Sequence, residues 1–345
     1  MDGRILLFLL QDGLTNGAIY ALLGFALVLV FTVTRIIFIP QGEFVAYGGL
    51  TFALLCAGKM PGTVWLLLVF GVVSCVIELW RKRHLLTWQA CFREFAGGIA
   101  LPIIVLILVQ TFTRPNQSIW LNLVLTLAIV VPMGPYLYRI AFQPLANASV
   151  LTLLIAAVGV HLSMVGIGLV FFGAEGLRAP TLTDVSFALG QLPFTGQTIA
   201  VYAVTLALTG ALYLFFDRTL RGKALRATAA NRLGARLVGI SVAGSGQIAF
   251  ALSSFLGAIS GILIVPVTTI YYDTGFLIGL KGFVAAIFGA LASYPITAVA
   301  AVAVGIIEAF ASFHASNYKE VIVFMLIVPV LLWRSLYAPQ VEEDE

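Results

Sequence analysis

Charged residues are scarce in this chain. Only 10% of its 345 residues are Asp, Glu, Lys or Arg, whereas 61% are hydrophobic. A soluble domain has about 25% charged and about 45–50% apolar residues, so a single water-facing globule is excluded. The composition predicts an all-α, polytopic membrane protein. The net charge of +4 then bears on how loops lie relative to the bilayer and gives no reason to expect nucleic-acid binding.

Catalytic and metal-binding patterns are also missing. The sequence contains no HExxH, no Walker A motif, no nucleophile elbow and no cluster of paired carboxylates. Its three cysteines, Cys56, Cys75 and Cys91, lack metal-ligand spacing. We therefore expect no catalytic residue, no metal and no cofactor bound by this chain. For His161, inside an apolar stretch, we favour a hydrogen-bonded core histidine over a ligand or proton-relay role.

Long apolar runs are abundant. A helix that crosses the hydrocarbon core needs about 20 mostly apolar residues. Eleven segments approach this length: 14–34, 43–58, 61–80, 95–112, 119–138, 150–173, 198–216, 245–266, 276–291, 296–313 and 319–334. Two of them, 43–58 and 276–291, are short and could be discontinuous or re-entrant. We expect about 9–11 spans in one membrane domain over residues 1–345.

Positive charge is concentrated in one break between apolar runs, the basic segment, residues 217–240. It carries six Lys or Arg against one acid, and its Ala-rich composition predicts a folded helical element. With the N-terminus outside and every run crossing, thirteen of the 19 Lys and Arg lie inside and five outside. The positive-inside rule then predicts an outside N-terminus and an inside C-terminus. A pure topology signal and a docking element are equally good readings of the basic segment at this point.

Three ionisable residues lie in or beside apolar runs, where a buried charge is costly. Glu43 directly follows Gln41 and Gly42, while Lys281 and Glu308 lie inside later runs. We favour a structural role, in which one or both glutamates pair with Lys281 or with backbone groups to fix helix packing. The other reading is a polar translocation path.

Glycines recur at spacings that let membrane helices approach closely. The small-xxx-small steps lie at residues 13 and 17, 257 and 261, and 275 and 279. A loose internal echo links 40–55 with 273–291, because each begins with a polar turn containing Gly and continues as a short apolar segment. Repeated broken helices of this kind favour a transport pathway where they meet.

Four stretches resemble the permease subunits of branched-chain amino-acid ABC importers (LivH-like). They are GLTNGAIYALLGFALVLVFTVTRIIF (13–38) followed by Gln-Gly-Glu, RGKALRATAANRLGARLVGI (221–240), AFALSSFLGAISGIL (249–263) with LKGFVAAIFGAL (280–291), and GIIEAF with NYKEVIVFMLIVPVLL (305–332). The resemblance implies an all-α inner-membrane permease that moves branched-chain amino acids or related small polar solutes inward. It also implies a periplasmic N-terminus, a cytoplasmic C-terminus and no ATPase activity in this chain.

The resemblance further implies partners. These are a second related permease (LivM-like), two ATP-binding cassette subunits that bind the ATP, a periplasmic solute-binding protein and the lipid bilayer of a bacterial inner membrane. In this family the counterpart of the basic segment docks on an ATPase. The residues expected to act there are Arg221, Gly222, Arg226, Ala229, Arg232 and Gly239. The candidates for the translocation path are Gln41, Gly42, Glu43, Lys281 and Glu308.

The chain departs from the family pattern in three places. Residues 38–41 read Phe-Ile-Pro-Gln where the family usually has Asn-Phe-Ala-His, and Asn231 stands where an acidic residue is usual. Residues 65–120 are longer than the pattern, as though a helical hairpin with a basic tip at 81–94 had been inserted. These departures weaken any assignment of the solute.

A self-contained secondary transporter or channel is the alternative function. Such a protein needs its own ion-coupling residues. The sequence offers only Glu43, Lys281, Glu308 and His161 for that task. Co-purification with two nucleotide-binding subunits would separate the two functions.

Overall fold

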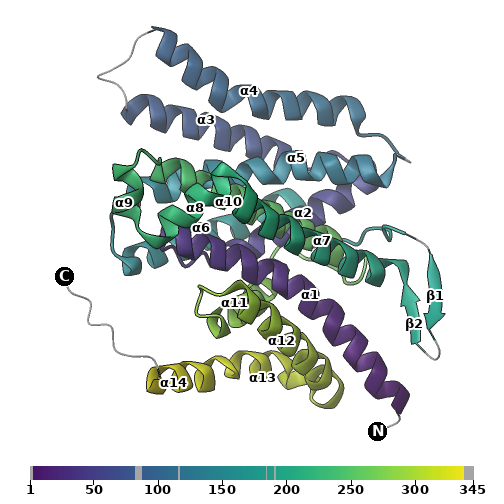
Figure 1. Cartoon of the computed structure of the whole chain (residues 1–345). Coiled ribbons are helices and arrows are strands. Elements are labelled where there is room, and N and C mark those ends of the chain that lie inside the picture. The colour runs from purple at the N-terminus through teal and green to yellow at the C-terminus, as the bar shows by residue number, and fades with distance from the viewer. Residues whose placement is uncertain (1–2, 82–87, 116, 184, 190–191, 338–345) are drawn as a thin grey trace.

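Helices make up nearly all of the molecule (Figure 1). The computed structural model describes residues 3–81, 88–115, 117–183, 185–189 and 192–337. The helices are α1 (Gly3–Thr34), α2 (Gln41–Cys56), α3 (Thr63–Arg81), α4 (Trp88–Phe112), α5 (Ile119–Leu137), α6 (Val150–Phe172), α7 (Gly196–Arg218), α8 (Leu220–Ala230), α9 (Arg232–Leu237), α10 (Val242–Ile264), α11 (Thr274–Phe288), α12 (Tyr294–His314), α13 (Lys319–Met325) and α14 (Ile327–Tyr337). A π-helix (Tyr138–Phe142) and a 3-10 helix (Gln143–Leu145) extend α5, and a 3-10 helix (Ser316–Tyr318) precedes α13.

The pattern of long apolar helices confirms the polytopic all-α prediction. Among the described residues, eight helical stretches are long and apolar enough to cross a bilayer: 3–34, 63–81, 119–145, 150–172, 196–218, 242–264, 294–314 and 316–333. The two segments predicted to be short are short, with 16 residues in α2 and 15 in α11. At 1.5 Å per residue each spans only about 22–24 Å, less than the hydrocarbon thickness.

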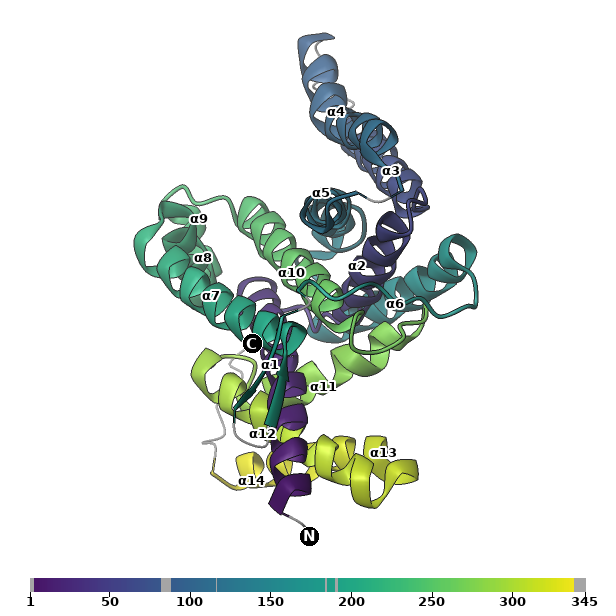
Figure 2. The ribbon, with the colours of Figure 1, turned by 90° about the vertical axis from the view of Figure 1, so that its right-hand side faces the viewer.

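Helix α1 lies at the centre of the bundle, between α10 and α12 (Figure 2). In its most apolar window 89% of the residues are buried inside the protein, against 11% for α7. Gly13 and Gly17 allow α12 to approach, because a Cβ on either would lie within 2.7 Å of α12 backbone at Ile306 or Val302. The predicted small-residue contact at this step is confirmed, and α7 is left largely exposed on the surface of the chain.

The other two glycine steps also form close helix contacts. A Cβ at Gly261 would lie 2.1 Å from the carbonyl oxygen of Val45, so α10 packs directly on α2. Gly275 and Gly279 of α11 approach Gly42 of α2 in the same way. These contacts hold α2 against both α10 and α11.

Helices α3 and α4 pack along each other and project away from the rest of the bundle (Figure 2). Gly71 of α3 makes the closest approach, since a Cβ there would lie 2.7 Å from the carbonyl oxygen of Gly98. Most of the basic tip expected at 81–94 lies outside the described residues or has side chains outside them. That the α3–α4 arm is an inserted hairpin stays a prediction.

The two ends of the bundle carry different elements (Figure 1). The described start of α1 lies at one end together with a hairpin of β1 (Ser186–Leu189) and β2 (Leu192–Thr195), while α8 and α9 lie at the other. In the hairpin Ser186 pairs with Thr195 and Leu189 with Leu192.

The last apolar run, predicted as one segment over 319–334, is interrupted at Leu326 between α13 and α14. Pro329 explains the break. Proline has no N–H to donate, and its ring clashes with the carbonyl four residues earlier. That carbonyl belongs to Met325, the last residue of α13.

Candidate functional site

Lys281 lies in a buried ionic cluster that joins four helices. Its Nζ is 2.5 Å from Oε1 of Glu308 on α12 and 3.2 Å from Oε1 of Glu320 on α13. The second oxygen of Glu308 accepts a hydrogen bond of 2.5 Å from the hydroxyl of Tyr20 on α1. The ammonium group also lies 5.9 Å from the centroid of the Tyr20 ring.

This cluster satisfies its most deeply buried members. Lys281 and Glu308 are 5% and 8% exposed, and both oxygens of Glu308 have a partner. A paired and hydrogen-bonded buried charge persists where an isolated one would be prohibitive. The cluster therefore fixes α11, α12 and α13 against α1, as the structural reading of Lys281 and Glu308 requires.

Glu320 was missed by the sequence analysis. It lies in the first turn of α13, one residue beyond Lys319, at the edge of the last apolar run. The rule that drew attention to Glu308, a carboxylate in an apolar context, applies to Glu320 as well. It was overlooked because its position beside Lys319 is typical of a solvated helix end.

Glu43 occupies a separate site with a different partner. Its side chain is fully buried in the first turn of α2, and Oε1 lies 3.0 Å from Nδ1 of His161 on α6. The two atoms are at ion-pair distance but are not aligned as a hydrogen bond, and Oε2 has no hydrogen-bond partner among the described residues. The His161 ring lies against that of Phe276 on α11, with centroids 4.6 Å apart. Glu43 therefore does not pair with Lys281.

The first turns of α2 and α11 meet beside this pair. A Cβ at Gly42 would lie 2.0 Å from the carbonyl oxygen of Gly275, so only glycine allows the contact. Gln41 ties the same turn to α10, because its Nε2 donates to the carbonyl of Ser253 at 3.1 Å while its Oε1 accepts from the Ser253 hydroxyl. Helix N-termini carry partial positive charge, which favours the Glu43 carboxylate here. The two segments of the internal echo are thus brought together.

Aromatic packing fills the turn where the sequence departs from the family pattern. The Phe38 ring lies 4.7 Å from that of Phe250, 5.8 Å from Phe142 and 6.0 Å from Phe44. Edge-to-face and tilted contacts at these separations are favourable. The polar side chain that the family usually places at this position is replaced by an aromatic cluster, and Gln41 keeps the polar contact to α10.

The basic segment folds into two short helices with side-chain caps. Thr219 accepts from the Gly222 N–H at 2.9 Å at the start of α8, and Asn231 accepts from the Gly234 N–H at 2.8 Å at the start of α9. Asn and Asp are both good N-caps, so Asn231 suits its position although it replaces an acidic residue.

Helix α8 packs on the membrane helices. A Cβ at Gly222 would lie 2.1 Å from the carbonyl oxygen of Phe215 on α7. The hydroxyls of Thr228 on α8 and Ser245 on α10 are 3.1 Å apart. Movement of α8 must therefore displace the ends of α7 and α10.

The remaining residues of the basic segment differ in exposure. Arg221 is exposed, and Ala229 faces the interior in part. Arg232 lies partly buried on α9; burial lowers its pKa, and its Nε has no partner among the described residues. Gly239 follows α9 with φ of 83°, a left-handed conformation that favours glycine. The six residues singled out here lie together on α8, α9 and the turn after them, whereas the five path candidates divide between the Lys281 and Glu43 sites.

Comparison with known proteins identifies the family. The family model described as the permease component of the branched-chain amino acid transport system matches residues 9–331. The high-affinity branched-chain amino acid transport system permease protein BraD of Pseudomonas aeruginosa is 28% identical over 228 residues, 63% of this chain and 74% of the relative. LivH of Escherichia coli, described in the same words, is 24% identical over 344 residues, 96% of this chain and 95% of the relative.

One solved structure, PsaBC from Streptococcus pneumoniae in complex with Fab, aligns over 96% of this chain and 92% of its own, with 11% identity. Its TM-score of 0.38 is too low to inform the fold. The sequence relatives and the family match along the chain, together with its apolar helices, are decisive. The chain belongs to the family of permease components of branched-chain amino acid transport systems, and it is a multi-pass membrane permease.

Proposed function

We propose that this chain is one of two permease subunits of an ATP-driven importer for branched-chain amino acids or related small polar solutes. Its family and the printed function of BraD and LivH support that solute class. The partners are a second, LivM-like permease, two ATP-binding cassette subunits and a periplasmic solute-binding protein. ATP is bound and hydrolysed by the cassette subunits, and this chain has no catalytic site of its own.

The distribution of charge supports a periplasmic N-terminus and a cytoplasmic C-terminus in a bacterial inner membrane. When every apolar run crosses, the two short ones included, thirteen of the 19 Lys and Arg lie on one side in this orientation and five on the other. The basic segment and the end of α3 lie at the same end of the bundle, opposite the start of α1 (Figure 1). That end would face the cytoplasm and the cassette subunits.

The observation that carries the proposal is the direct packing of α8 on α7 and α10. Its capped first turn, its Gly222 contact with α7 and its Thr228 contact with Ser245 join it to two membrane helices. A cassette subunit that pushed on Arg221, an exposed residue of α8, would therefore move α7 and α10.

The candidates for the translocation path at the start of α2 are connected to α8 through α10. Helix α10 holds the first turn of α2 through Ser253 and Gln41, and Gly42 in turn holds α11. Displacing α10 would part the α2–α11 junction beside Glu43. We assign Gln41, Gly42 and Glu43 to the gate of the translocation path, and Lys281 and Glu308 to the scaffold around it.

The test is Gly222→Leu in the complete transporter reconstituted in liposomes. The new side chain meets α7 backbone and displaces α8, at a cost of about 1–3 kcal/mol if the turn adapts. We expect membrane insertion to be retained, while transport is lost and ATP hydrolysis is either uncoupled from it or lost with cassette binding.

Gly234→Ala is the matched control, because a Cβ there makes only ordinary contacts of 3.4 Å or more within α9. Normal transport by Gly222→Leu would reduce the basic segment to a topology signal. Solute uptake by the purified chain without ATP or cassette subunits would overturn the proposal and favour a secondary transporter or channel.

A further inference from the structure

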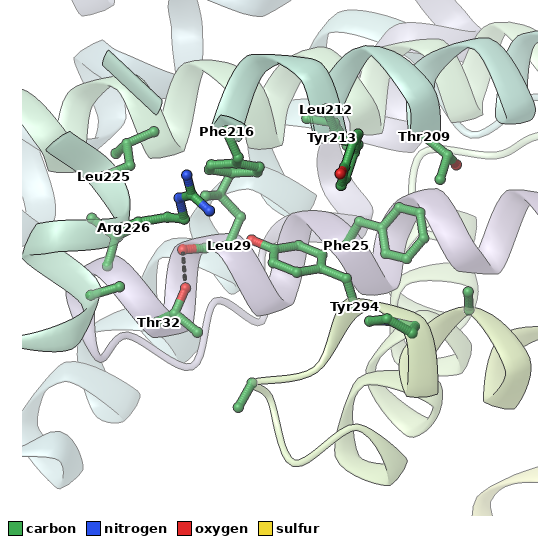
Figure 3. A pocket seen from close by; sticks show the side chains of 15 residues that line it. Phe25, Leu29, Thr32, Thr209, Leu212, Tyr213, Phe216, Leu225, Arg226 and Tyr294 are labelled. Carbon is green, nitrogen blue, oxygen red and sulfur yellow. Dashed lines mark hydrogen bonds between the residues drawn. The ribbon is translucent and has the colours of Figure 1, made fainter. Parts of the chain in front are cut away.

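A cavity of about 680 Å³ lies between α1, α7, α8 and α12 (Figure 3). It is separate from both ionic sites, and its volume is in the range of small-molecule pockets. Leu29, Leu212 and Ala298 contribute aliphatic wall, and aromatic rings form one side. In that side the Tyr294 ring lies 5.8 Å from Phe25 and 5.8 Å from Phe216.

Apart from Arg226, the polar side chains among the lining residues are four that carry hydroxyls: Thr32, Thr209, Tyr213 and Tyr294. Thr32 and Thr209 line the cavity, but each hydroxyl donates to a carbonyl of its own helix, Thr32 to Val28 at 2.8 Å and Thr209 to Thr205 at 2.7 Å. A polar solute held here would lose more hydrogen bonds to water than these few groups could replace. An occupant must therefore be largely apolar.

Arg226 is the one charged residue among the described residues that line the cavity. It reaches in from α8, and Figure 3 shows its guanidinium between Phe216 and Thr32. The guanidinium of Arg226 also faces Asp217: Nη2 of Arg226 lies 3.9 Å from Oδ1 of Asp217, and both side chains are about half exposed. An exposed pair at this distance is weak, so the guanidinium is available to a phosphate.

The cavity lies where the last turn of α1 and the end of α7 meet the basic segment. In the orientation proposed above, on which this step rests, that is the level of the cytoplasmic lipid headgroups. Anionic lipids of that leaflet are attracted to Lys and Arg at the membrane surface.

We propose that this cavity binds an anionic phospholipid, with an acyl chain between Phe25, Leu29, Leu212 and Phe216 and the phosphate on Arg226. The apolar body with a single cation at its end matches an acyl chain with a charged headgroup. The bound lipid contacts α8, α1 and α12 together, so it restricts movement of the basic segment relative to the core of the bundle.

The test measures lipid retained by the purified full chain, by native mass spectrometry, after exposure to phosphatidylglycerol or phosphatidylcholine with identical acyl chains. We expect about five-fold preference for phosphatidylglycerol, the factor expected for one cation near the headgroup. Arg226→Gln abolishes the preference. Ala298→Trp fills the cavity from α12 and lowers retention of both lipids.

Lys223→Gln is the matched control, because Lys223 is an exposed cation on the same helix that does not line the cavity. It leaves the preference unchanged. Equal retention of the two lipids by the unmodified chain overturns the proposal, as does a preference that survives both Arg226→Gln and Ala298→Trp. Displacement of the lipid by glycerol phosphate at equal concentration would instead identify a site for a free anion.

Gel filtration of each variant shows that it is folded, and Ala298→Trp keeps the proposal testable should Arg226→Gln fail to fold. The measurement needs neither ATP nor the cassette subunits. If the chain showed no lipid preference, the proposed importer function would therefore still stand. If Gly222→Leu transported normally, the importer proposal would be weakened, but the lipid proposal would not be affected.

Discussion

Glu308 and Glu43 are both buried glutamates in the membrane bundle, but their surroundings differ. Glu308 has a partner for each oxygen, Lys281 on one side and Tyr20 on the other. Glu43 has His161 at ion-pair distance, and neither of its oxygens accepts a hydrogen bond among the described residues. The same residue type thus holds helices together at one site and keeps unused polar capacity at the other.

The difference indicates which glutamate belongs to moving parts. A fully paired buried charge resists separation of its helices, because parting them strands a charge in a low-dielectric interior. A carboxylate with spare capacity can exchange partners at a smaller cost. The Glu43 site also lies where two short helices meet through glycine, the junction that gating would open.

Lys281→Met should give the largest effect. It strands the Glu308 carboxylate, and breaking a buried pair in this way costs about 3–5 kcal/mol. We expect a clear loss of folded, assembled protein, measured by thermal unfolding in detergent and by gel filtration.

The double variant Lys281→Met with Glu308→Gln should recover a large part of that stability, since no charge is left stranded at Glu308 and Tyr20 keeps an acceptor. Normal assembly of Lys281→Met with lost transport would instead move the cluster from the scaffold to the translocation path.

Glu43→Gln should affect stability much less, by about 1 kcal/mol or below, because the amide has nearly the same volume and carries no charge. Transport should fall, since one carboxyl oxygen beside the α2–α11 junction is replaced by an amide group that can only donate hydrogen bonds. Solute uptake in liposomes and thermal unfolding of the same preparation separate the two effects. Unchanged uptake would make Glu43 a second scaffold residue and remove the contrast with Glu308.

Asp217→Asn should have the smallest effect, because it measures how little an exposed ion pair contributes to the stability of this protein. Asp217 contacts Arg218 at 3.2 Å and Arg226 at 3.9 Å, and all three side chains are about half exposed or more. Exposed pairs contribute about 0–1 kcal/mol, so the melting temperature should hardly change. A loss comparable to that of Lys281→Met would show that burial is not what separates these ion pairs.

The helices and their order could be predicted because length and hydropathy are local properties of the chain. The two short spans and the glycine contacts were both anticipated from such patterns. The break at Leu326 was not, although Pro329 signalled it. Thr219 and Asn231 are typical N-cap residues and mark the starts of α8 and α9. The sequence analysis predicted a helical element there but did not predict two separate helices.

The pairing of charges could not be predicted to the same extent. That Lys281 meets Glu308 and Glu320 while Glu43 meets His161 depends on how helices far apart in sequence are rotated against one another. Apolar composition nearly uniform around each helix leaves that rotation undetermined, since lipid and protein neighbours favour the same side chains. Single residues such as Gly42 and Gly275 fix it, and their partners are visible only in three dimensions.

The central position of α1 has a consequence for synthesis in the cell. Helix α1 is synthesised before α12, yet Gly13 and Gly17 are covered by Ile306 and Val302 of α12, nearly 300 residues later. At about 5–20 residues per second, this interval lasts roughly 15–60 s. During that time the small-residue face of α1 is covered only by lipid or by the insertion machinery. Biogenesis of this permease therefore requires that the glycine face of α1 wait for α12 before its native contact can form.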